Sequence, residues 1–323
     1  MTGGILTLTM NPAVDVSAVT DHVVPTNKLR CRDASRDSGG GGINVARVIG
    51  RLGGACRAIY TAGGALGQQL RDILQEQGVD SIAIDVAAET RESFSVTEAR
   101  SGAQYRFVLP GEALDRKDWQ ACIDTVATYA EPHHYVVASG SLPPGAPDDL
   151  YARLAEKLSD QDVRLVVDSS GPALGAALRH GIHMAKPNLQ ELRDLTGAPL
   201  ECRADWEEAA TGLVRDGRAE ILLLTLGEEG AFLVTRDLRV RADAVPVKAI
   251  SAVGAGDSFL AAMVWRLVSG DEPEAAFRYA IAAGSAALLT PGTDLCHKED
   301  VERLLDQVRT KRIDVASIDS NKG

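Results

Sequence analysis

Short apolar runs rich in branched side chains alternate along this chain with longer amphipathic segments of helical length. The amphipathic segments include residues 148–158 and 205–216, and the apolar runs are residues 58–60, 135–138, 164–168, 183–185 and 221–225. Parallel strands require crossover connections, and a parallel sheet is covered by helices on both faces. The alternation therefore predicts an α/β fold with a mostly parallel central sheet, in which ligands bind beyond the carboxyl ends of the strands.

Two segments, at about residues 14–36 and 89–108, interrupt this alternation. In each of them polar and apolar side chains take turns, which is the period of a half-buried strand. We therefore expect a second, smaller β-sheet built from these two segments. The last residues, 311–323, are polar and lack a hydrophobic repeat, so we expect the chain to fray from about Thr310.

The composition argues against several classes of protein. With 323 residues, the chain can form one large α/β domain or two smaller ones. A formal net charge of −11 argues against nucleic-acid and anionic-membrane partners, since both need an extended positive surface. Residues 5–10 alternate like a strand, and no run approaches about 18 apolar residues, so neither a signal peptide nor a membrane span is predicted. Five dispersed cysteines without a C-x-x-C pair are typical of reduced thiols, and we expect a cytoplasmic protein.

The segment Gly254-Ala255-Gly256-Asp257 places an acid directly behind a turn of small residues, at the start of the apolar run 259–267. Glycines let the backbone approach a ligand closely, and the N–H groups that open a helix face negative charge. A carboxylate at this point can accept a proton from an attacking hydroxyl. Phosphoryl transfer to an alcohol requires these parts, whereas the alternative interpretation is an ordinary helix cap.

A run of four glycines, residues 39–42, precedes another predicted helix, whose apolar face begins at Ile43. Each glycine costs about 0.5–1 kcal/mol of backbone entropy relative to alanine, so a purely structural loop has no need of four. Further motifs follow in order at residues 61–67, 139–145, 186–192 and 225–231. Together with the segment that ends at Asp257, they resemble the motifs of the PfkB carbohydrate kinase family, also called ribokinase-like, over about residues 5–308.

The resemblance implies a single ribokinase-like domain over residues 1–310, in which the small sheet is a lid over a sugar. In many members the lids of two subunits pack together, so a homodimer is expected. The resemblance also implies that Asp257 is the general base. The backbone N–H groups of Gly254, Ala255 and Gly256 are implied to form an anion hole for the transferring phosphoryl group.

For the phosphoryl donor, the resemblance implies ATP together with Mg²⁺. Asn188 and Glu191 match the family motif N-x-x-E, which helps to organise Mg²⁺ through water; taken alone, the same spacing is a common helix cap. The positions implied to bind the nucleotide are Lys186, Asn188, Thr225, Gly227, Gly230, Ile281 and Ser285. No G-x-x-x-x-G-K-[ST] string is present, so the chain is not a P-loop kinase.

The resemblance further implies a K⁺ ion, held mainly by backbone carbonyl oxygens. The matching positions are Ser251, Val253, Ala287, Thr290, Gly292 and Asp294. The chain departs from the family pattern at Ala252, where most members have Thr, and at Ser251, where many have Asp. These departures weaken any side-chain contribution to the anion hole, whereas the backbone donors are unaffected.

For the acceptor, the resemblance implies a phosphorylated sugar. Asp15 and Asn44 are implied to hydrogen-bond sugar hydroxyls, with Gly40 and Gly41 at the ring. The phosphate-binding positions of the phosphosugar branch are matched by cations in the two lid segments, with a serine nearby: Lys28, Arg30, Arg91 and Ser141.

Within the family, four strings resemble the 6-phosphofructokinase branch, which converts fructose 6-phosphate to fructose 1,6-bisphosphate: residues 28–31, 39–47, 105–108 and 168–171. Relatives that act on fructose 1-phosphate or tagatose 6-phosphate usually carry Lys within the glycine run, where this chain has Gly41. Those two substrates remain alternatives. A non-catalytic sugar-phosphate sensor is an alternative of a different class, and the presence of Asp257, Asn188 and Glu191 argues against it.

Overall fold

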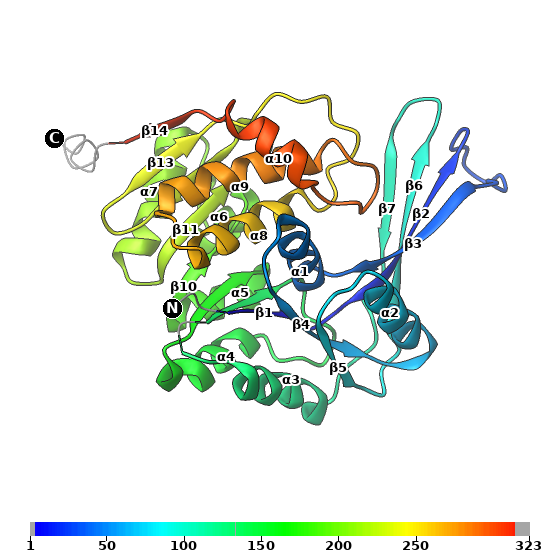
Figure 1. Cartoon of the computed structure of the whole chain (residues 1–323), viewed down its shortest axis with the longest axis horizontal. Helices are drawn as coiled ribbons and strands as arrows, with labels where there is room; N and C mark the ends of the chain where they lie inside the picture. The colour runs from blue at the N-terminus through cyan, green and yellow to red at the C-terminus, as the bar shows by residue number, and fades with distance from the viewer. Residues whose placement is uncertain (1–3, 133, 314–323) are drawn as a thin grey trace.

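The computed structural model describes residues 4–132 and 134–313, and its centre is a ten-stranded sheet (Figure 1). The strand order is β14-β13-β12-β11-β10-β9-β8-β1-β4-β5, and the strands from β11 through β5 in this order run parallel. Their bounds are β1 (Ile5–Thr9), β4 (Arg57–Ala62), β5 (Ser81–Asp85), β8 (Tyr135–Ser139), β9 (Arg164–Asp168), β10 (Ile182–Ala185), β11 (Ala219–Thr225), β12 (Ala231–Val234), β13 (Arg239–Ala242) and β14 (Thr310–Arg312). The apolar runs predicted as strands all lie in this sheet.

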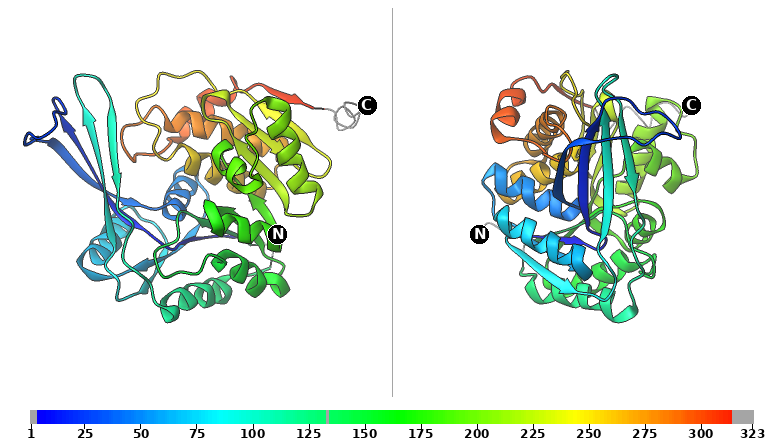
Figure 2. Two further views of the ribbon diagram at one scale, coloured as in Figure 1. Left: turned by 180° about the vertical axis from the view of Figure 1, so that it is seen from behind. Right: turned by 90° about the vertical axis from the view of Figure 1, so that its right-hand side faces the viewer.

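Helices cover both faces of the sheet (Figures 1 and 2). One face carries α1 (Gly41–Leu52), α8 (Ala255–Val268), α9 (Pro273–Ala287) and α10 (Lys298–Leu305). The other face carries α3 (Arg116–Tyr129), α4 (Leu150–Leu158), α5 (Gly171–His180), α6 (Leu189–Thr196) and α7 (Arg203–Arg215). The remaining helix, α2 (Gly64–Glu76), packs beside β4. Two short 3₁₀ helices are η1 (Ser159–Gln161) and η2 (Gly227–Glu229). None of the helices in the described ranges is long and apolar enough to cross a bilayer.

The strands divide their side chains between two hydrophobic cores. In β1, Ile5 belongs to the core under α1 and α8, whereas Leu6 and Leu8 belong to the core under α3 to α7. The two-residue period of each strand therefore fixes which side chains meet which helices. The fold class predicted from the alternation is confirmed.

A separate four-stranded sheet projects from the large one (Figure 1). Its order is β3-β2-β6-β7, with bounds β2 (Ala13–Thr20), β3 (Arg32–Gly39), β6 (Arg91–Glu98) and β7 (Gln104–Val108). β2 and β6 are parallel, and the other neighbours are antiparallel. These strands come from the two segments that interrupt the alternation in the sequence. The loop between β2 and β3, residues 21–31, lies at the free end of this small sheet.

The C-terminal segment differs in part from the expectation. Thr310–Arg312 forms β14, which pairs antiparallel with β13, and the N–H of Ile313 donates to the carbonyl oxygen of Arg239 at 3.0 Å. The prediction that the chain frays from Thr310 was therefore wrong for these residues, because β13 offers backbone partners that a sequence pattern does not reveal. Residues 314–323 of the expected tail lie outside the described residues.

Candidate active site

Two cavities meet at the first turn of α8, beyond the carboxyl ends of β8, β9 and β11. The first has a volume of about 330 Å³, and the predicted positions that line it are Asp15, Gly40, Gly41, Asn44, Arg91, Ser141, Glu191, Val253, Gly254 and Asp257. The second has a volume of about 430 Å³, and the predicted positions that line it are Asn188, Thr225, Gly227, Gly230, Ala255, Gly256, Ile281 and Ser285. Most of the residues singled out in the sequence therefore gather around one helix turn.

The glycine run forms the junction between β3 and α1. Gly39 ends β3, Gly40 precedes α1 and Gly41 begins it, so half of the run lies inside the helix rather than before it. Gly40 has a φ of 118°, which a residue with a side chain rarely adopts. A Cβ atom at Gly41 would overlap Oγ of Ser139, and one at Gly39 would overlap the Asp15 carboxylate. The glycines thus let α1, β2 and β8 approach closely enough to share the first cavity.

Asp257 lies half-buried in the first turn of α8, where its Oδ2 accepts a hydrogen bond from Nδ2 of Asn44 at 2.8 Å. Burial, together with the negative charge of Asp168, raises the pKa of Asp257 to about 6. Such a carboxylate is ionised at neutral pH and is a better proton acceptor than an exposed one. Gly254 precedes the helix with a φ of 75°, and no described side chain caps the helix, so its first N–H groups can donate to a ligand.

An ion pair between Lys186 and Asp168 lies beside this turn. Nζ of Lys186 is 3.0 Å from Oδ1 of Asp168; the Lys186 side chain is buried, and that of Asp168 is 15% exposed. Burial opposes the positive charge of Lys186, but the field of Asp168 outweighs it and the pKa of Lys186 is raised. A Cβ atom at Gly256 would lie 3.4 Å from the same Nζ. Lys186 is therefore a fixed cation at the junction of the two cavities.

Asp168 lines the first cavity but was not among the predicted site residues. It ends β9, one of the central parallel strands, and strand ends are where such folds bind ligands. The sequence does mark Asp168 in one way, because it begins the string 168–171 that resembles the 6-phosphofructokinase branch.

Two arginines of the small sheet line the first cavity. Arg91 donates to the carbonyl oxygens of Leu109 and Asn11 at 2.6 and 3.0 Å, so the backbone holds its guanidinium. Arg106 was not predicted as a site residue, and its guanidinium makes no hydrogen bond or ion pair with any described residue. Burial raises the pKa of Asp15 to about 6, against the opposing charges of Arg106 and Arg91. The cavity thus combines half-buried carboxylates with cations able to bind an anionic group.

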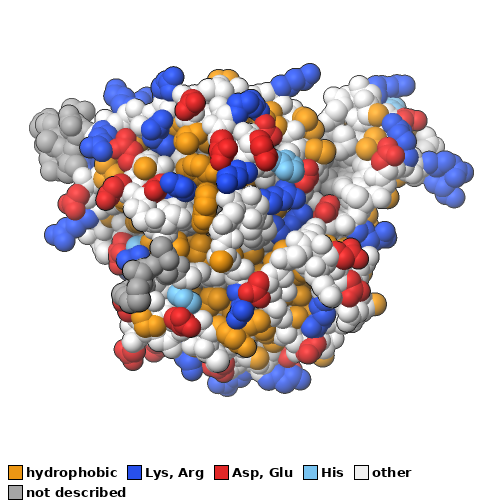
Figure 3. Space-filling model, in the orientation of Figure 1, with side chains coloured by type: hydrophobic (Ala, Val, Ile, Leu, Met, Phe, Trp, Pro, Cys, Tyr) orange, Lys and Arg blue, Asp and Glu red, His pale blue; other side chains and the backbone are white. Residues whose placement is uncertain are grey.

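Lys28 and Arg30 are not brought to this cavity. Both are exposed in the loop at the free end of the small sheet, and neither lines the first cavity. In Figure 3 this end carries basic side chains interspersed with acidic ones and projects from the body of the molecule. The expected grouping of Lys28 and Arg30 with Arg91 is therefore not found within one chain, because β2 and β3 carry their connection away from the large sheet.

Asn188 and Glu191 form a reciprocal cap at the start of α6. Oδ1 of Asn188 accepts from the N–H of Glu191 at 2.9 Å, and Oε2 of Glu191 accepts from the N–H of Asn188 at 2.8 Å. The capping alternative is thus realised, although Asn188 also lines the second cavity and Glu191 the first. Within residues 4–132 and 134–313, no three His, Cys, Asp or Glu side chains form a group able to hold a metal ion. Mg²⁺ at this place would therefore take most ligands from water and phosphate oxygens, which is its usual preference.

The second cavity lies between the β11–β12 connection and α9. Thr225 and Gly227 line one side, and Ile281 and Ser285 of α9 line the other. Gly230 has a φ of 99°, and a Cβ atom there would overlap the carbonyl oxygen of Ala242, so only glycine lets the connection close in this way. A mostly apolar slot with a few polar groups suits a planar aromatic base.

The two loops expected to hold K⁺ lie against each other beside α8. Oγ of Ser251 donates to the carbonyl oxygen of Gly292 at 3.3 Å. Oγ1 of Thr290 donates to the carbonyl oxygen of Ala287 at 2.9 Å. The carboxylate of Asp294, by contrast, forms an ion pair at 3.1 Å with an arginine of α1. The structure therefore places Ser251 against Gly292, whereas Asp294 has a partner for its side chain and for its backbone carbonyl oxygen, to which Arg51 donates at 2.6 Å.

Comparison with known proteins places this arrangement in a family. The model of the pfkB family carbohydrate kinases matches residues 8–300. The ATP-dependent 6-phosphofructokinase isozyme 2 of Mycobacterium tuberculosis is 43% identical over 302 residues, which are 94% of this chain and 89% of that protein. A 1-phosphofructokinase of Borreliella burgdorferi is 29% identical over 310 residues, which are 96% of this chain and 99% of that protein.

Solved structures give the same result. Crystal structures of phosphofructokinase-2 from Escherichia coli, in complex with potassium and in complex with fructose-6-phosphate, have TM-scores of 0.91 and 0.90. Each is 38% identical, and each match covers 94% of this chain and 99% of that one. The family match spans the small sheet, most of the large sheet and every residue that lines the two cavities. The chain therefore belongs to the PfkB family of carbohydrate kinases.

Proposed function

We propose that this chain is an ATP-dependent 6-phosphofructokinase, which phosphorylates the 1-hydroxyl of fructose 6-phosphate. The proposal rests on Asp257, which lies with the open N-terminus of α8 where the two cavities meet. A hydroxyl in the first cavity and a terminal phosphate from the second would both reach this turn. Arg91 and Arg106 suit a phosphate at the other end of the sugar. The relatives named for 6-phosphofructokinase activity are also more similar than the 1-phosphofructokinase described above.

In this mechanism the sugar hydroxyl gives its proton to the carboxylate of Asp257 while its oxygen forms a bond to the γ-phosphorus of ATP. The bond between that phosphorus and the departing ADP oxygen breaks, which leaves ADP, the bisphosphate and a protonated Asp257. Backbone N–H groups of Gly254, Ala255 and Gly256 donate to the transferring phosphoryl oxygens. Lys186 adds a fixed positive charge beside Gly256, and Asn44 holds the carboxylate in place.

Two cations complete the proposal. Asn188 and Glu191 would position Mg²⁺ through water, where it would neutralise nucleotide phosphate charge. Burial raises the pKa of Glu191, so a nearby cation would favour its ionised form. The carbonyl groups of the two loops beside α8 would hold K⁺, as oxygen ligands suit this ion. Their proximity supports the assignment, through contacts such as that between Ser251 and Gly292.

We also propose a homodimer in which the small sheets of two subunits pack together. Large apolar side chains are exposed on this sheet and its connections: Leu29, Phe94, Tyr105, Phe107, Val108 and Leu109. Such a concentration on one element is typical of a surface that another protein covers. A second subunit would also be the only source of Lys28 and Arg30 for a sugar-phosphate site. Light scattering should give the mass of two chains, and a mass of one chain at assay concentration would contradict the dimer.

Activity should depend on a group with a pKa near 6. Asp257 must be ionised to accept a proton, and burial holds its pKa at about 6, so kcat/KM should fall about tenfold per pH unit below that value. Asp15 titrates in the same range and should steepen the fall. Steady-state rates between pH 5 and 8 with saturating Mg²⁺-ATP measure this profile. A profile that stays flat down to pH 5 would contradict the assignment of the base.

Replacing Arg106 with Met should raise KM for the phosphosugar about tenfold and change kcat much less. The variant removes a cation that lines the first cavity without a described partner, and a charged hydrogen bond contributes about 1.5–3 kcal/mol. KM for ATP should stay constant because Arg106 does not line the second cavity. Arg100→Met, at the turn between β6 and β7, is the matched control and should keep wild-type constants. An unchanged KM for the phosphosugar would remove Arg106 from the proposed site.

The substrate assignment is tested by measuring ADP release with Mg²⁺-ATP and K⁺. We expect a clear preference in kcat/KM for fructose 6-phosphate over tagatose 6-phosphate, fructose 1-phosphate and fructose. A preference for another phosphosugar would keep the mechanism and change the substrate. No turnover on any of the four would favour a sugar-phosphate sensor.

A further inference from the structure

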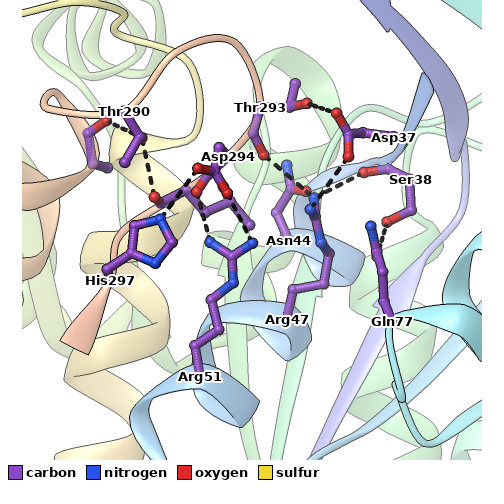
Figure 4. Close-up of polar contacts among 12 residues, drawn as sticks. Asp37, Ser38, Asn44, Arg47, Arg51, Gln77, Thr290, Thr293, Asp294 and His297 are labelled. Atoms are coloured by element: carbon purple, nitrogen blue, oxygen red, sulfur yellow. Dashed lines mark hydrogen bonds and ion pairs between the residues drawn. The ribbon is translucent and has the colours of Figure 1, made fainter. Parts of the chain in front are cut away.

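The side-chain amide of Asn44 has two ends, and each has a partner. Its Nδ2 donates to Asp257, as described above, while its Oδ1 accepts a hydrogen bond from a terminal nitrogen of Arg47 at 3.3 Å (Figure 4). An asparagine amide that turns over exchanges its donor and its acceptor. A guanidinium can only donate, so Arg47 holds the amide oxygen toward itself and the NH₂ group toward Asp257.

Arg47 is itself held from two directions, as Figure 4 shows. The same nitrogen donates to the carbonyl oxygens of Ser38 in β3 and of Thr293 at 3.1 and 3.5 Å. Its other terminal nitrogen lies 3.8 Å from Oδ1 of Asp37, whose Oδ2 accepts from the Thr293 hydroxyl at 3.0 Å. Arg47, only 6% exposed, therefore joins the small sheet to the α9–α10 loop, residues 288–297.

This joint lies at the end of the small sheet that borders the first cavity. Asp37 on β3 pairs in register with Asp15 on β2, and Asp15 lines the cavity. Gly39 ends β3 two residues after Asp37, and Gly40, which lines the cavity, comes next. A shift of β3 relative to α1 would therefore disturb the acceptor side of the cavity and the contacts of Arg47 together.

We propose that Arg47 is a positioning residue for the general base, which keeps the Asn44 amide directed at Asp257 while it is clamped between β3 and the α9–α10 loop. One guanidinium thereby links the position of the small sheet over the acceptor to the orientation of the Asn44 amide at the base. Arg47 lines neither of the two cavities, so it acts through Asn44 rather than on a substrate. The inference rests on the proposed function of Asp257 as base.

A double-mutant cycle tests this role. Arg47→Met and Asn44→Ala should each lower kcat about tenfold to 100-fold, because the first frees the amide to turn and the second removes its bond to the base. The double variant should be no slower than Asn44→Ala by more than about threefold, since Arg47 acts through the residue already removed. KM for ATP should stay constant in all three. Arg266→Met, a partly buried arginine paired with Asp271 near the other end of α8, is the control and should keep wild-type kcat.

Arg47→Lys serves if the Met variant fails to fold, because it keeps a positive charge beside Asp37. Lysine has one nitrogen where the guanidinium uses two, so it cannot keep both the bond to Asn44 and the approach to Asp37. The value of kcat should therefore still fall, and the loss should again not add to that of Asn44→Ala. Losses that multiply in the double variant, or wild-type kcat in either Arg47 variant, would overturn the inference. Failure of the proposed function gives a different result, since the wild-type protein would then turn over no phosphosugar at all.

Discussion

Replacement of Asp257 with Asn should lower kcat by at least about 10²-fold at pH 7.5, with a much smaller change in KM for the phosphosugar. The amide keeps the size of the side chain and can still accept the hydrogen bond from Asn44, but it cannot take the proton of the attacking hydroxyl. Coupled ADP release under saturating ATP measures the loss. Asp271→Asn, a partly buried acid beyond the other end of α8, is the matched control and should keep wild-type turnover.

The stability of the same variant separates lost chemistry from lost folding. Because the folded pKa of Asp257 is raised from 3.8 to about 6, its contribution to stability is present below about pH 4 and is lost as the pH rises through 6. At pH 7.5 the buried charge opposes folding, so the neutral Asn should not lower Tm. Thermal unfolding at pH 7.5 checks this. Phosphate transfer by Asp257→Asn at the wild-type rate would rule out the mechanism.

Replacement of Gly254 with Ala should lower kcat by about 10²-fold and Tm by a few degrees. The residue has a φ of 75°, where an L-side chain costs about 1 kcal/mol or more, and the added Cβ would overlap the Leu295 side chain. Leu295 is fully buried and has little room to turn away, so we expect the overlap to displace the first turn of α8. That shift moves the N–H groups of the anion hole and the Asp257 carboxylate together, and loss of one such donor alone costs about 10²–10³ in kcat.

Gly270→Ala is the matched control for Gly254→Ala. Gly270 follows the other end of α8 with a φ of 96°, and nothing lies within 4 Å of the position of an added Cβ. This variant carries backbone strain without displacing the catalytic turn, so Tm should fall slightly while kcat stays at the wild-type value. Equal kcat in the two variants would mean that the geometry at Gly254 does not matter for transfer.

The local elements and the main catalytic turn follow from the sequence because their signals are short-range. The pattern of the apolar runs depends on a few neighbouring residues, and it predicted β4, β8, β9, β10 and β11 of the large sheet. The two alternating segments likewise predicted the separate small sheet. The glycine run and the segment ending at Asp257 are likewise local, since each describes one strand-to-helix or loop-to-helix junction. The parallel-sheet rule placed the motifs that follow predicted strands, such as residues 186–192 and 225–231, where ligands bind.

The sequence did not predict the placement of residues whose surroundings come from distant parts of the chain. Arg106 looks like one more surface charge in an alternating strand, and only the folded small sheet directs it to the first cavity. Lys28 and Arg30 show the reverse, because their strands carry them away from the cavity that Arg91 lines. The pairing of β14 with β13 depends on an edge formed about 70 residues earlier in the chain.

The sequence by itself determined the fold class, the glycine-rich junctions and the acid at the start of α8, because helical and strand periods and turn chemistry are set by neighbours along the chain. Tertiary structure alone decided which charges share a cavity, the pairing of Lys186 with Asp168, and the contacts of Arg47 with β3 and the α9–α10 loop. Those contacts join residues as many as 246 positions apart, and only the close approach of separate elements in the folded chain creates them.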